Sequence, residues 1–238
     1  YSAFTSYTGF KVNSGEYKLM GLAPYGDPKY ARTILDNLID VKPDGSFRLH
    51  MEYFDYCTGL TMTNAKFDAL FGEPARKAEN DLLTQFHMDI AASIQAVLNE
   101  IVLKLTRSIA KETGMKNLCM AGGVALNCVA NGKILKDGAF ENLWIQPASG
   151  DAGGALGAAL SGYYQFKNGA RHRNGNSTTD TMRGSYLGPE FKQSDIEARL
   201  TAAGAKFTSY DDAGLVNAVA ASLADGQAVG WFEGRMEF

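Results

Sequence analysis

LCMAGGVALNCVANGKILKDGAFENLWIQPASGDAGGALGAAL, residues 118–160, is the stretch that indicates the fold class of this chain. Its first residues, 118–121, are apolar and too few for a helix, and a Gly-Gly pair follows them, which predicts a buried strand and a tight turn. A helix is expected from about Leu126, and a second strand over 140–146 stops at Pro147. Strands alternating with helices predict a parallel α/β architecture.

The turns in this stretch favour a ligand. Gly122 and Gly123 have no Cβ, so backbone N–H groups can approach a ligand closely, and the N-terminus of the next helix favours negative charge. This suits the phosphate or ribose of a nucleotide. Asp151, which opens a helix of Ala, Gly and Leu, can hold a metal or orient a water. Two simpler interpretations stay open: an ordinary turn, and an Asp that caps its helix for about 1 kcal/mol.

Three motifs together resemble one family. They are GEYKLMGLAPYGDP (15–28), GGVALN (122–127) and QPASGDAGGALGAAL (146–160). In this order they resemble the O-carbamoyltransferases of nodulation-factor and antibiotic tailoring. That family is related to the proteins that make threonylcarbamoyl-adenosine on tRNA and, through them, to the superfamily of actin, sugar kinases and heat-shock ATPases. The resemblance implies part of an actin/sugar-kinase-like nucleotide-binding domain, followed by the start of a second α/β domain.

The resemblance also implies a reaction. The parent enzyme would use ATP and carbamoyl phosphate to form carbamoyl adenylate, and would transfer the carbamoyl group to a hydroxyl of a small molecule. Catalytic residues are not assigned. A divalent metal, iron or magnesium, would be held by Asp151, with histidines that precede this chain. The nucleotide would be held by a set of residues near the motifs: Glu16, Lys18, Gly122, Gly123, Val124 and Asn127.

Glu16 and Lys18 have two interpretations. The resemblance would have Glu16 accept hydrogen bonds from ribose hydroxyls and would put Lys18 near phosphate. The alternative is a solvated pair on a short surface helix over 16–22, which is the usual state of charged residues. The density of Gly and Pro around them favours the interpretation that they bind a ligand, because such a sequence makes a poor helix and is hard to explain by packing.

The resemblance divides the chain into three parts. Residues 1–167 would be the carboxy-terminal part of the carbamoyl-transfer domain, 168–184 a polar linker, and 185–238 the beginning of the domain that forms carbamoyl adenylate. Helices over 194–203 and 212–225 and a buried strand over 228–233 are expected there. Arg235, in WFEGRMEF, would hold a phosphate bidentately or would be an ordinary surface residue. Arg171, His172 and Arg173 are interpreted as a solvated loop.

The rest of the amino-terminal part is interpreted as supporting structure. Short helices are expected over 30–38 and 63–71, and a strand over 47–54 that contains a partly buried His50. Apolar residues at a three-to-four spacing predict one long core helix over 81–113, ended by Gly114. His87 lies one residue off the apolar stripe and is interpreted as structural or solvent-facing.

Composition fits a cytoplasmic enzyme. The 238 residues are 45% hydrophobic with a formal net charge of −3, and lack a long basic run, which argues against nucleic-acid binding. Membrane insertion is not expected, since no apolar run reaches about 18 residues. The spacing of Cys57, Cys119 and Cys128 suggests neither a disulfide framework nor a zinc site, and the last two are expected in the core.

The chain begins at Tyr1 and resembles the middle of a longer protein, so alone it is expected to be catalytically silent. The acceptor, the metal and the oligomeric state stay open. Two other classes compete with the carbamoyltransferase: a kinase of the same superfamily, which would release ADP, and a non-catalytic nucleotide-binding module.

Overall fold

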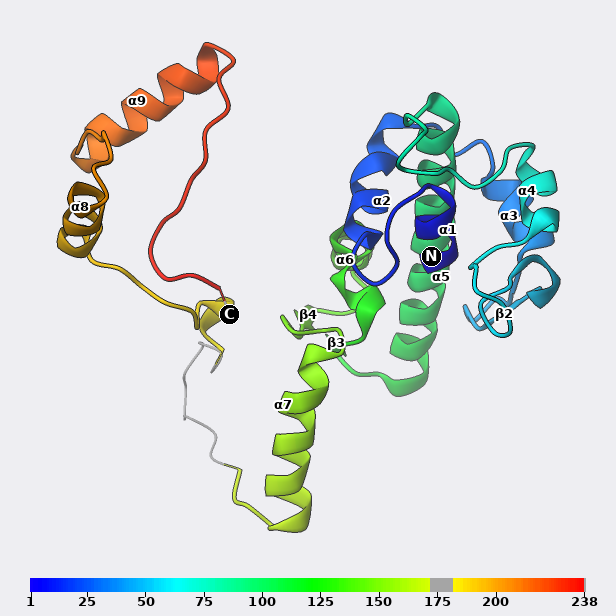
Figure 1. Ribbon diagram of the computed structural model, residues 1–238. Helices are drawn as coiled ribbons and strands as arrows, with labels where there is room; N and C mark the ends of the chain where they lie inside the picture. Colours follow the sequence, from blue (N-terminus) through cyan, green and yellow to red (C-terminus); the bar gives the residue numbers. More distant parts are fainter. Residues whose placement is uncertain (172–181, 238) are drawn as a thin grey trace. The chain divides into compact units, whose positions relative to one another are not determined.

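The computed structural model describes residues 1–171 and 182–237, and the chain divides into two units, Tyr1–Gly169 and Ala170–Phe238 (Figure 1). The helices of the first unit are α1 (Ser2–Tyr7), α2 (Glu16–Leu22), η1 (Ala23–Tyr25), α3 (Ala31–Asn37), η2 (Met51–Tyr53), α4 (Ala65–Phe71), α5 (Gln85–Thr113), η3 (Gly123–Leu126), α6 (Cys128–Asp137), α7 (Ala152–Ser161) and the π-helical η4 (Gly162–Phe166). Its strands are β1 (Ile39–Val41), β2 (Phe47–Leu49), β3 (Asn117–Met120) and β4 (Asn142–Ile145).

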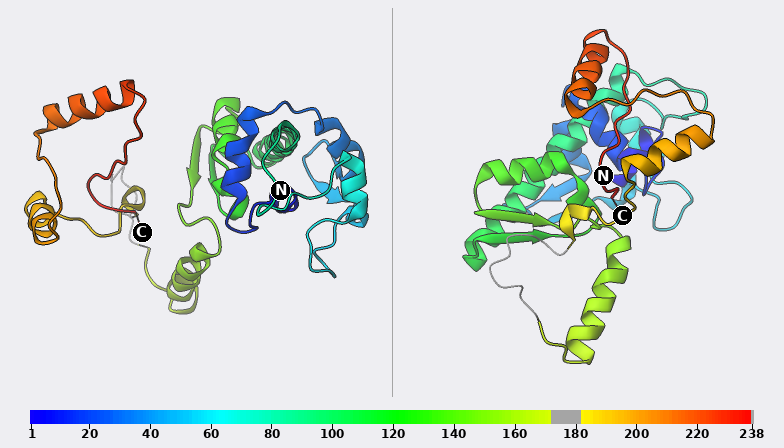
Figure 2. Two further views of the ribbon diagram at one scale, coloured as in Figure 1. Left: turned by 45° about the horizontal axis from the view of Figure 1, so that its top comes forward. Right: turned by 90° about the vertical axis from the view of Figure 1, so that its left-hand side faces the viewer.

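The long helix α5 is the centre of the first unit. The central part of its apolar stripe is buried, with Ile90, Val97 and Ile101 at most 7% exposed. Helices α1, α2, α3, η1 and α6 contact it, and the left view of Figure 2 looks almost along α5, between α2 and α6 on one side and α3 and α4 on the other. The predicted core helix is therefore confirmed. In the described parts of the chain, no helix is long and apolar enough to cross a membrane.

The ends of α5 are fixed by local chemistry. Gly114 ends it in the left-handed conformation with φ 62°, as its sequence predicts. The helix begins at Gln85 rather than near Asp81, because Thr84 and His87 form a capping box that starts it there. The backbone N–H of Thr84 donates to Nδ1 of His87 at 3.1 Å. His87 is 5% exposed, so its structural interpretation is confirmed.

The buried His87 predicts that the stability of the protein depends on pH. Burial lowers the pKa of His87 below its usual 6.5, so the folded chain keeps the imidazole neutral. As the pH falls below 6.5, His87 becomes protonated in the unfolded chain while it stays neutral in the folded chain. The free energy of unfolding is therefore expected to fall. Urea unfolding from pH 7.5 down to about 5 measures this. The variant His87→Gln keeps a capping-box side chain without the proton, and should lose this part of the pH dependence; an unchanged slope would assign it to another group.

The two small sheets differ in direction. Strands β3 and β4 pair in parallel, from Asn117 opposite Asn142 to Met120 opposite Ile145. Strands β1 and β2 pair as an antiparallel hairpin. The mixed α/β class of the first unit is confirmed, but the strand predicted over 47–54 is shorter, because η2 begins at Met51, and His50 is exposed rather than partly buried.

The cysteines are free and exposed. The expectation that Cys119 and Cys128 pack in the core is wrong. Side chains alternate along a strand, and Cys119 lies on the outer face of β3, whose residues are alternately exposed and half-buried. Cys128 is the first residue of α6, and its sulfur lies 3.7 Å from the sulfur of Met20.

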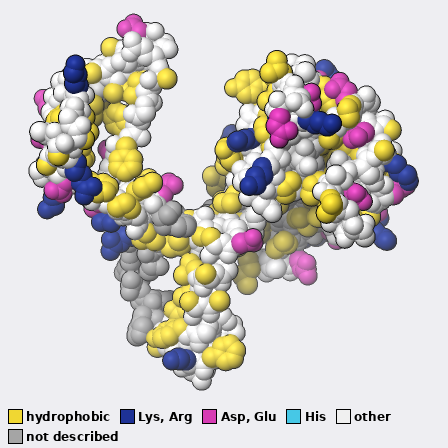
Figure 3. Space-filling view, viewed as in Figure 1, with side chains coloured by type: hydrophobic (Ala, Val, Ile, Leu, Met, Phe, Trp, Pro, Cys, Tyr) yellow, Lys and Arg dark blue, Asp and Glu magenta, His cyan; other side chains and the backbone are white. Residues whose placement is uncertain are grey.

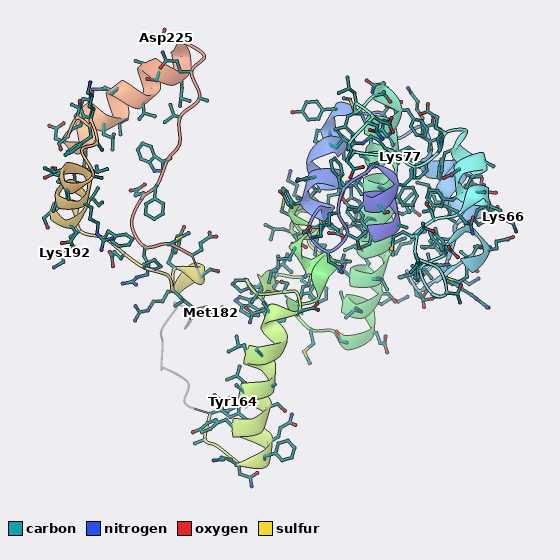
Figure 4. The ribbon with its side chains drawn as sticks, viewed as in Figure 1. Lys66, Lys77, Tyr164, Met182, Lys192 and Asp225 are labelled. Atoms are coloured by element: carbon teal, nitrogen blue, oxygen red, sulfur yellow. The ribbon has the colours of Figure 1, made fainter. Side chains whose placement is uncertain are left out.

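The second unit contains η5 (Arg183–Ser185), α8 (Gln193–Ala202) and α9 (Asp212–Ala224). Both long helices fall where they are predicted, but the strand predicted over 228–233 is wrong. A strand needs a neighbouring backbone to take up its hydrogen bonds, and no described segment of this unit pairs with it. Trp231 and Phe232 are accordingly 53% and 64% exposed. Figure 3 shows hydrophobic side chains along this unit, and Figure 4 shows its side chains between Met182 and Asp225.

Candidate functional site

A cavity of about 480 Å³ lies in the first unit, in the size range of small-molecule sites. Four segments that are distant in sequence surround it: the start of α1, the start of α2 with the loop before it, the Gly122-Gly123 turn, and the loop before α7. Its wall also contains Leu98 of α5. The residues that line it are Tyr1, Ser2, Asn13, Ser14, Glu16, Tyr17, Met20, Leu98, Gly123, Val124, Leu126, Asn127, Gly150 and Asp151.

Glu16 is a fixed hydrogen-bond acceptor in this wall. It is the first residue of α2, and its Oε1 accepts from the Ser2 hydroxyl and from the backbone N–H of Asn13, each at 3.0 Å. Burial alone would raise the pKa of Glu16, but these hydrogen bonds outweigh it and lower the pKa. The carboxylate therefore stays ionised, which suits a ligand that donates hydroxyl hydrogens.

The second half of the 15–28 motif has a packing role. The Asp89 carboxylate of α5 accepts from the Asp27 N–H at 2.9 Å and from Nζ of Lys29 at 2.6 Å. Burial would raise the pKa of Asp89, but these bonds and one from Gln85 lower it to about 2. Gly26 lies against the backbone of Met88. The expectation that packing would not explain this Gly-rich stretch is wrong for Gly26.

Glycine is needed at the two positions of the turn for different reasons. Gly122 has φ 98° and ψ 161°, a conformation that side chains strongly disfavour, and its N–H donates to the Ser149 carbonyl at 2.8 Å. Gly122 does not line the cavity, whereas Gly123 and Val124 do. A Cβ built on either glycine meets no described atom within 4 Å. The turn is therefore open to a ligand at Gly123.

Asn127 lines the cavity and also forms hydrogen bonds with helices α5 and α6. It is the N-cap of α6, which begins at Cys128 rather than near Leu126 because η3 comes first. Its Oδ1 accepts from the backbone N–H of Ala130 at 2.9 Å, and its amide is paired with that of Gln95. Asn127 is only 8% exposed, so the wall of the cavity contains a polar side chain that is held in place by its hydrogen bonds.

Asp151 lines the cavity. It immediately precedes α7, but its side chain makes no capping hydrogen bond and it is exposed. The simpler interpretation as a helix cap is therefore wrong. Across residues 1–171 and 182–237, no group of three or more His, Cys, Asp or Glu side chains could hold a metal. Within these residues, a metal at Asp151 would therefore have at most one further ligand of these types.

Lys18 is not among the residues that line the cavity. The Lys18 side chain is exposed, with Nζ 5.9 Å from the ring centroid of Tyr17. Arg235 belongs to the second unit, where it donates to the Gly188 carbonyl and pairs with Glu190, both at 2.8 Å. Their phosphate roles stay predictions. Of the expected solvated cluster at 171–173, His172 and Arg173 lie outside the described residues.

Several lining residues carry no signal in the sequence. Tyr17, Met20 and Leu98 have the side chains of ordinary core residues. Gln95, which does not line the cavity but pairs with Asn127, is one polar residue within a long helix. The roles of these residues depend on contacts between segments about 30 to 110 positions apart, which local periodicity does not report.

Comparison with known proteins identifies the family. Residues 1–160 match the family model described as carbamoyltransferase N-terminus. The chain therefore belongs to the carbamoyltransferase family, and the resemblance noted from its motifs is confirmed.

Three relatives show how much of a longer protein the chain matches. An uncharacterised protein of Synechocystis (sll1178) is 60% identical over the whole chain, which covers 38% of that protein. Nodulation protein NolO of Bradyrhizobium diazoefficiens is 35% identical, and nodulation protein NolNO of Sinorhizobium fredii is 34% identical, each over 94% of the chain. The chain covers 37% of NolO and 30% of NolNO. It spans about a third of the length of these relatives.

Proposed function

We propose that the cavity binds the adenylyl part of carbamoyl adenylate, within a larger protein that makes this compound from ATP and carbamoyl phosphate. That protein then transfers the carbamoyl group to a hydroxyl of a small molecule. The observation that carries the proposal is the meeting of Glu16, the Gly123 turn and Asp151 at one cavity in a member of the carbamoyltransferase family. The parallel pair of β3 and β4, with a glycine turn directly after β3, is consistent with the nucleotide-binding fold of the actin and sugar-kinase superfamily.

Each part of the wall suits a part of this ligand. Tyr17, Leu98 and Val124 supply apolar surface for a base. The ionised Glu16 accepts from ribose hydroxyls, and the open backbone at Gly123 permits close approach of a polar group. Asn127 adds an amide to the same wall.

Asp151 is suited to a metal. Its carboxylate carries no capping bond, and carboxylate oxygens are ligands for magnesium and iron. Since the described residues offer no cluster of three ligands, the proposal takes the other ligands from elsewhere in the protein. A metal bound there would polarise the carbamoyl carbonyl. In the transfer, the acceptor oxygen attacks the carbamoyl carbon, its proton passes to a base, and AMP leaves.

The test is the fate of ATP in the full-length protein. Release of pyrophosphate that depends on carbamoyl phosphate is expected, followed by carbamoyl transfer to an acceptor. With Asp151→Ala, pyrophosphate release should continue, while transfer should fall at least about tenfold, because that step loses a carboxylate. Radiolabelled carbamoyl phosphate follows the group into the acceptor.

Other outcomes have distinct meanings. If ADP appears instead and pyrophosphate release does not depend on carbamoyl phosphate, the protein is a kinase of the same superfamily. Nucleotide binding without turnover of ATP indicates a non-catalytic module. Loss of pyrophosphate release in Asp151→Ala would contradict two separate sites, because the proposal puts Asp151 only at the transfer site.

A further inference from the structure

Gln95 is a buried polar side chain on the apolar face of α5. It is 4% exposed, and its neighbours on α5 include the buried Ile94 and Val97. An amide buried without partners costs about 1 to 3 kcal/mol, so an unpaired glutamine here would oppose folding. The contacts of Gln95 show why it is tolerated and where it points.

Every hydrogen-bonding position of the Gln95 amide is used. Its Nε2 donates to Oδ1 of Asn99 at 2.9 Å and to Oδ1 of Asn127 at 3.1 Å. Its Oε1 accepts from the Tyr1 hydroxyl at 2.9 Å and from Nδ2 of Asn127 at 3.0 Å. A primary amide has two donor hydrogens and an oxygen with two lone pairs, so this set is complete. Two of these partners, Tyr1 and Asn127, line the cavity.

The network also decides which way the Asn127 amide faces. The backbone N–H of Ala130 requires the oxygen of Asn127, and Nε2 of Gln95 requires the same oxygen. The nitrogen of Asn127 is in turn held by Oε1 of Gln95. If the Asn127 amide were rotated by 180°, its NH2 group would face the N–H of Ala130, so that two donors would oppose each other. The two hydrogen bonds between the amides of Asn127 and Gln95 would also be lost. Gln95 and the α6 cap therefore fix Asn127 in one orientation.

We propose that Gln95 is a positioning residue of the cavity, which holds the Asn127 amide in the orientation that meets the nucleotide. The inference rests on the proposed function, since it takes the adenylyl group as the ligand. Asn127 makes the contact with the ligand, and Gln95 acts through it from behind. Because α5 packs against the core of the first unit, the position of Gln95 is rigid.

The first test is AMP binding to the full-length protein by calorimetry. In Gln95→Met, which keeps a long unbranched side chain, the Kd for AMP should rise about tenfold, the equivalent of about one net hydrogen bond. The matched control is Gln85→Met. Gln85 begins the same helix and is exposed, and it does not line the cavity, so its Kd should stay within about twofold of the wild type.

A double-mutant cycle separates positioning from general support of the fold. Asn127→Ser keeps a good helix cap but removes the amide. In that background, Gln95→Met should change the Kd for AMP by less than about twofold, because there is no amide left to orient. An equal loss in both backgrounds would overturn the inference, since Gln95 would then act on the fold. If Gln95→Met does not fold, Gln95→Glu, which keeps the size of the side chain but replaces the donor Nε2 with a second acceptor oxygen, takes its place in the same cycle.

The two proposals fail differently. A wild-type protein that does not bind AMP overturns the proposed function and this inference together. A wild-type protein that binds AMP, with an affinity that Gln95→Met leaves unchanged, overturns the inference alone.

Discussion

Gly26→Ala is expected to lower the free energy of unfolding of the full-length protein by about 3 kcal/mol, the upper end of what overpacking usually costs. The reason is steric only. Gly26 has φ −121° and ψ 167°, an extended conformation that alanine adopts freely. A Cβ there, however, would lie 2.1 Å from the backbone carbonyl carbon and oxygen of Met88 in α5. To make room, the loop must leave α5, which also pulls the Asp27 N–H away from Asp89.

Gly21→Ala is the matched control in the same motif. Gly21 lies inside α2, and a Cβ there meets no described atom within 4 Å. Alanine forms helix better than glycine, so this variant should gain about 0.5 to 1 kcal/mol. Urea unfolding of both variants measures the difference. Equal destabilisation by the two changes would contradict the close contact between Gly26 and Met88.

Gly122→Ala should weaken AMP binding about a hundredfold and cost about 1 to 3 kcal/mol of stability. The conformation of Gly122, with φ 98° and ψ 161°, belongs almost only to glycine. An added Cβ meets no described atom, so the strain lies in the backbone itself. Relief of that strain would move the turn, including the N–H that Gly122 donates to Ser149 in the loop that precedes Asp151.

Gly123→Ala separates the effect of backbone conformation on stability from the effect of a side chain on the approach of the ligand. Gly123 is not among the residues with positive φ, and it lines the cavity. Its alanine variant should keep the wild-type stability within about 0.5 kcal/mol and lose affinity for AMP only. Calorimetry and urea unfolding of both variants decide the matter. If Gly123→Ala destabilises the protein as much as Gly122→Ala, the assignment of the strain to Gly122 is wrong.

Local patterns were sufficient for much of the first unit. The three-to-four spacing of apolar residues predicted α5, and glycine predicted its end, because both signals lie within the helix itself. The short apolar runs around 118 and 142 predicted the parallel pair. The strand over 228–233 failed for the opposite reason. Its sequence favours a strand, but a strand exists only with a partner, and the described residues of its unit provide none.

Candidate residues could be named from the sequence where they lie in a turn or a motif. Gly123 and Asp151 were named from the turns that they form and Glu16 from its motif, and all three lie at the cavity. Gln95 could not be found in this way, since its role comes from pairing with Asn127, 32 positions later. Gly26 was read as a sign of a ligand, because the sequence does not show that α5 passes 2.1 Å from its missing Cβ.

Helix α5 also sets a limit on how the chain can change in length. Asp89 binds the 26–29 loop and Gln95 binds Asn127, and Gln95 lies six positions after Asp89, which places the two residues about 9 Å apart along the helix and about 120° apart around it. One inserted residue would turn Gln95 by about 100° and shift it by about 1.5 Å, so either the loop or the amide pair would lose its partner. Insertions and deletions among relatives should therefore avoid 89–99 and collect in the loops on either side of it.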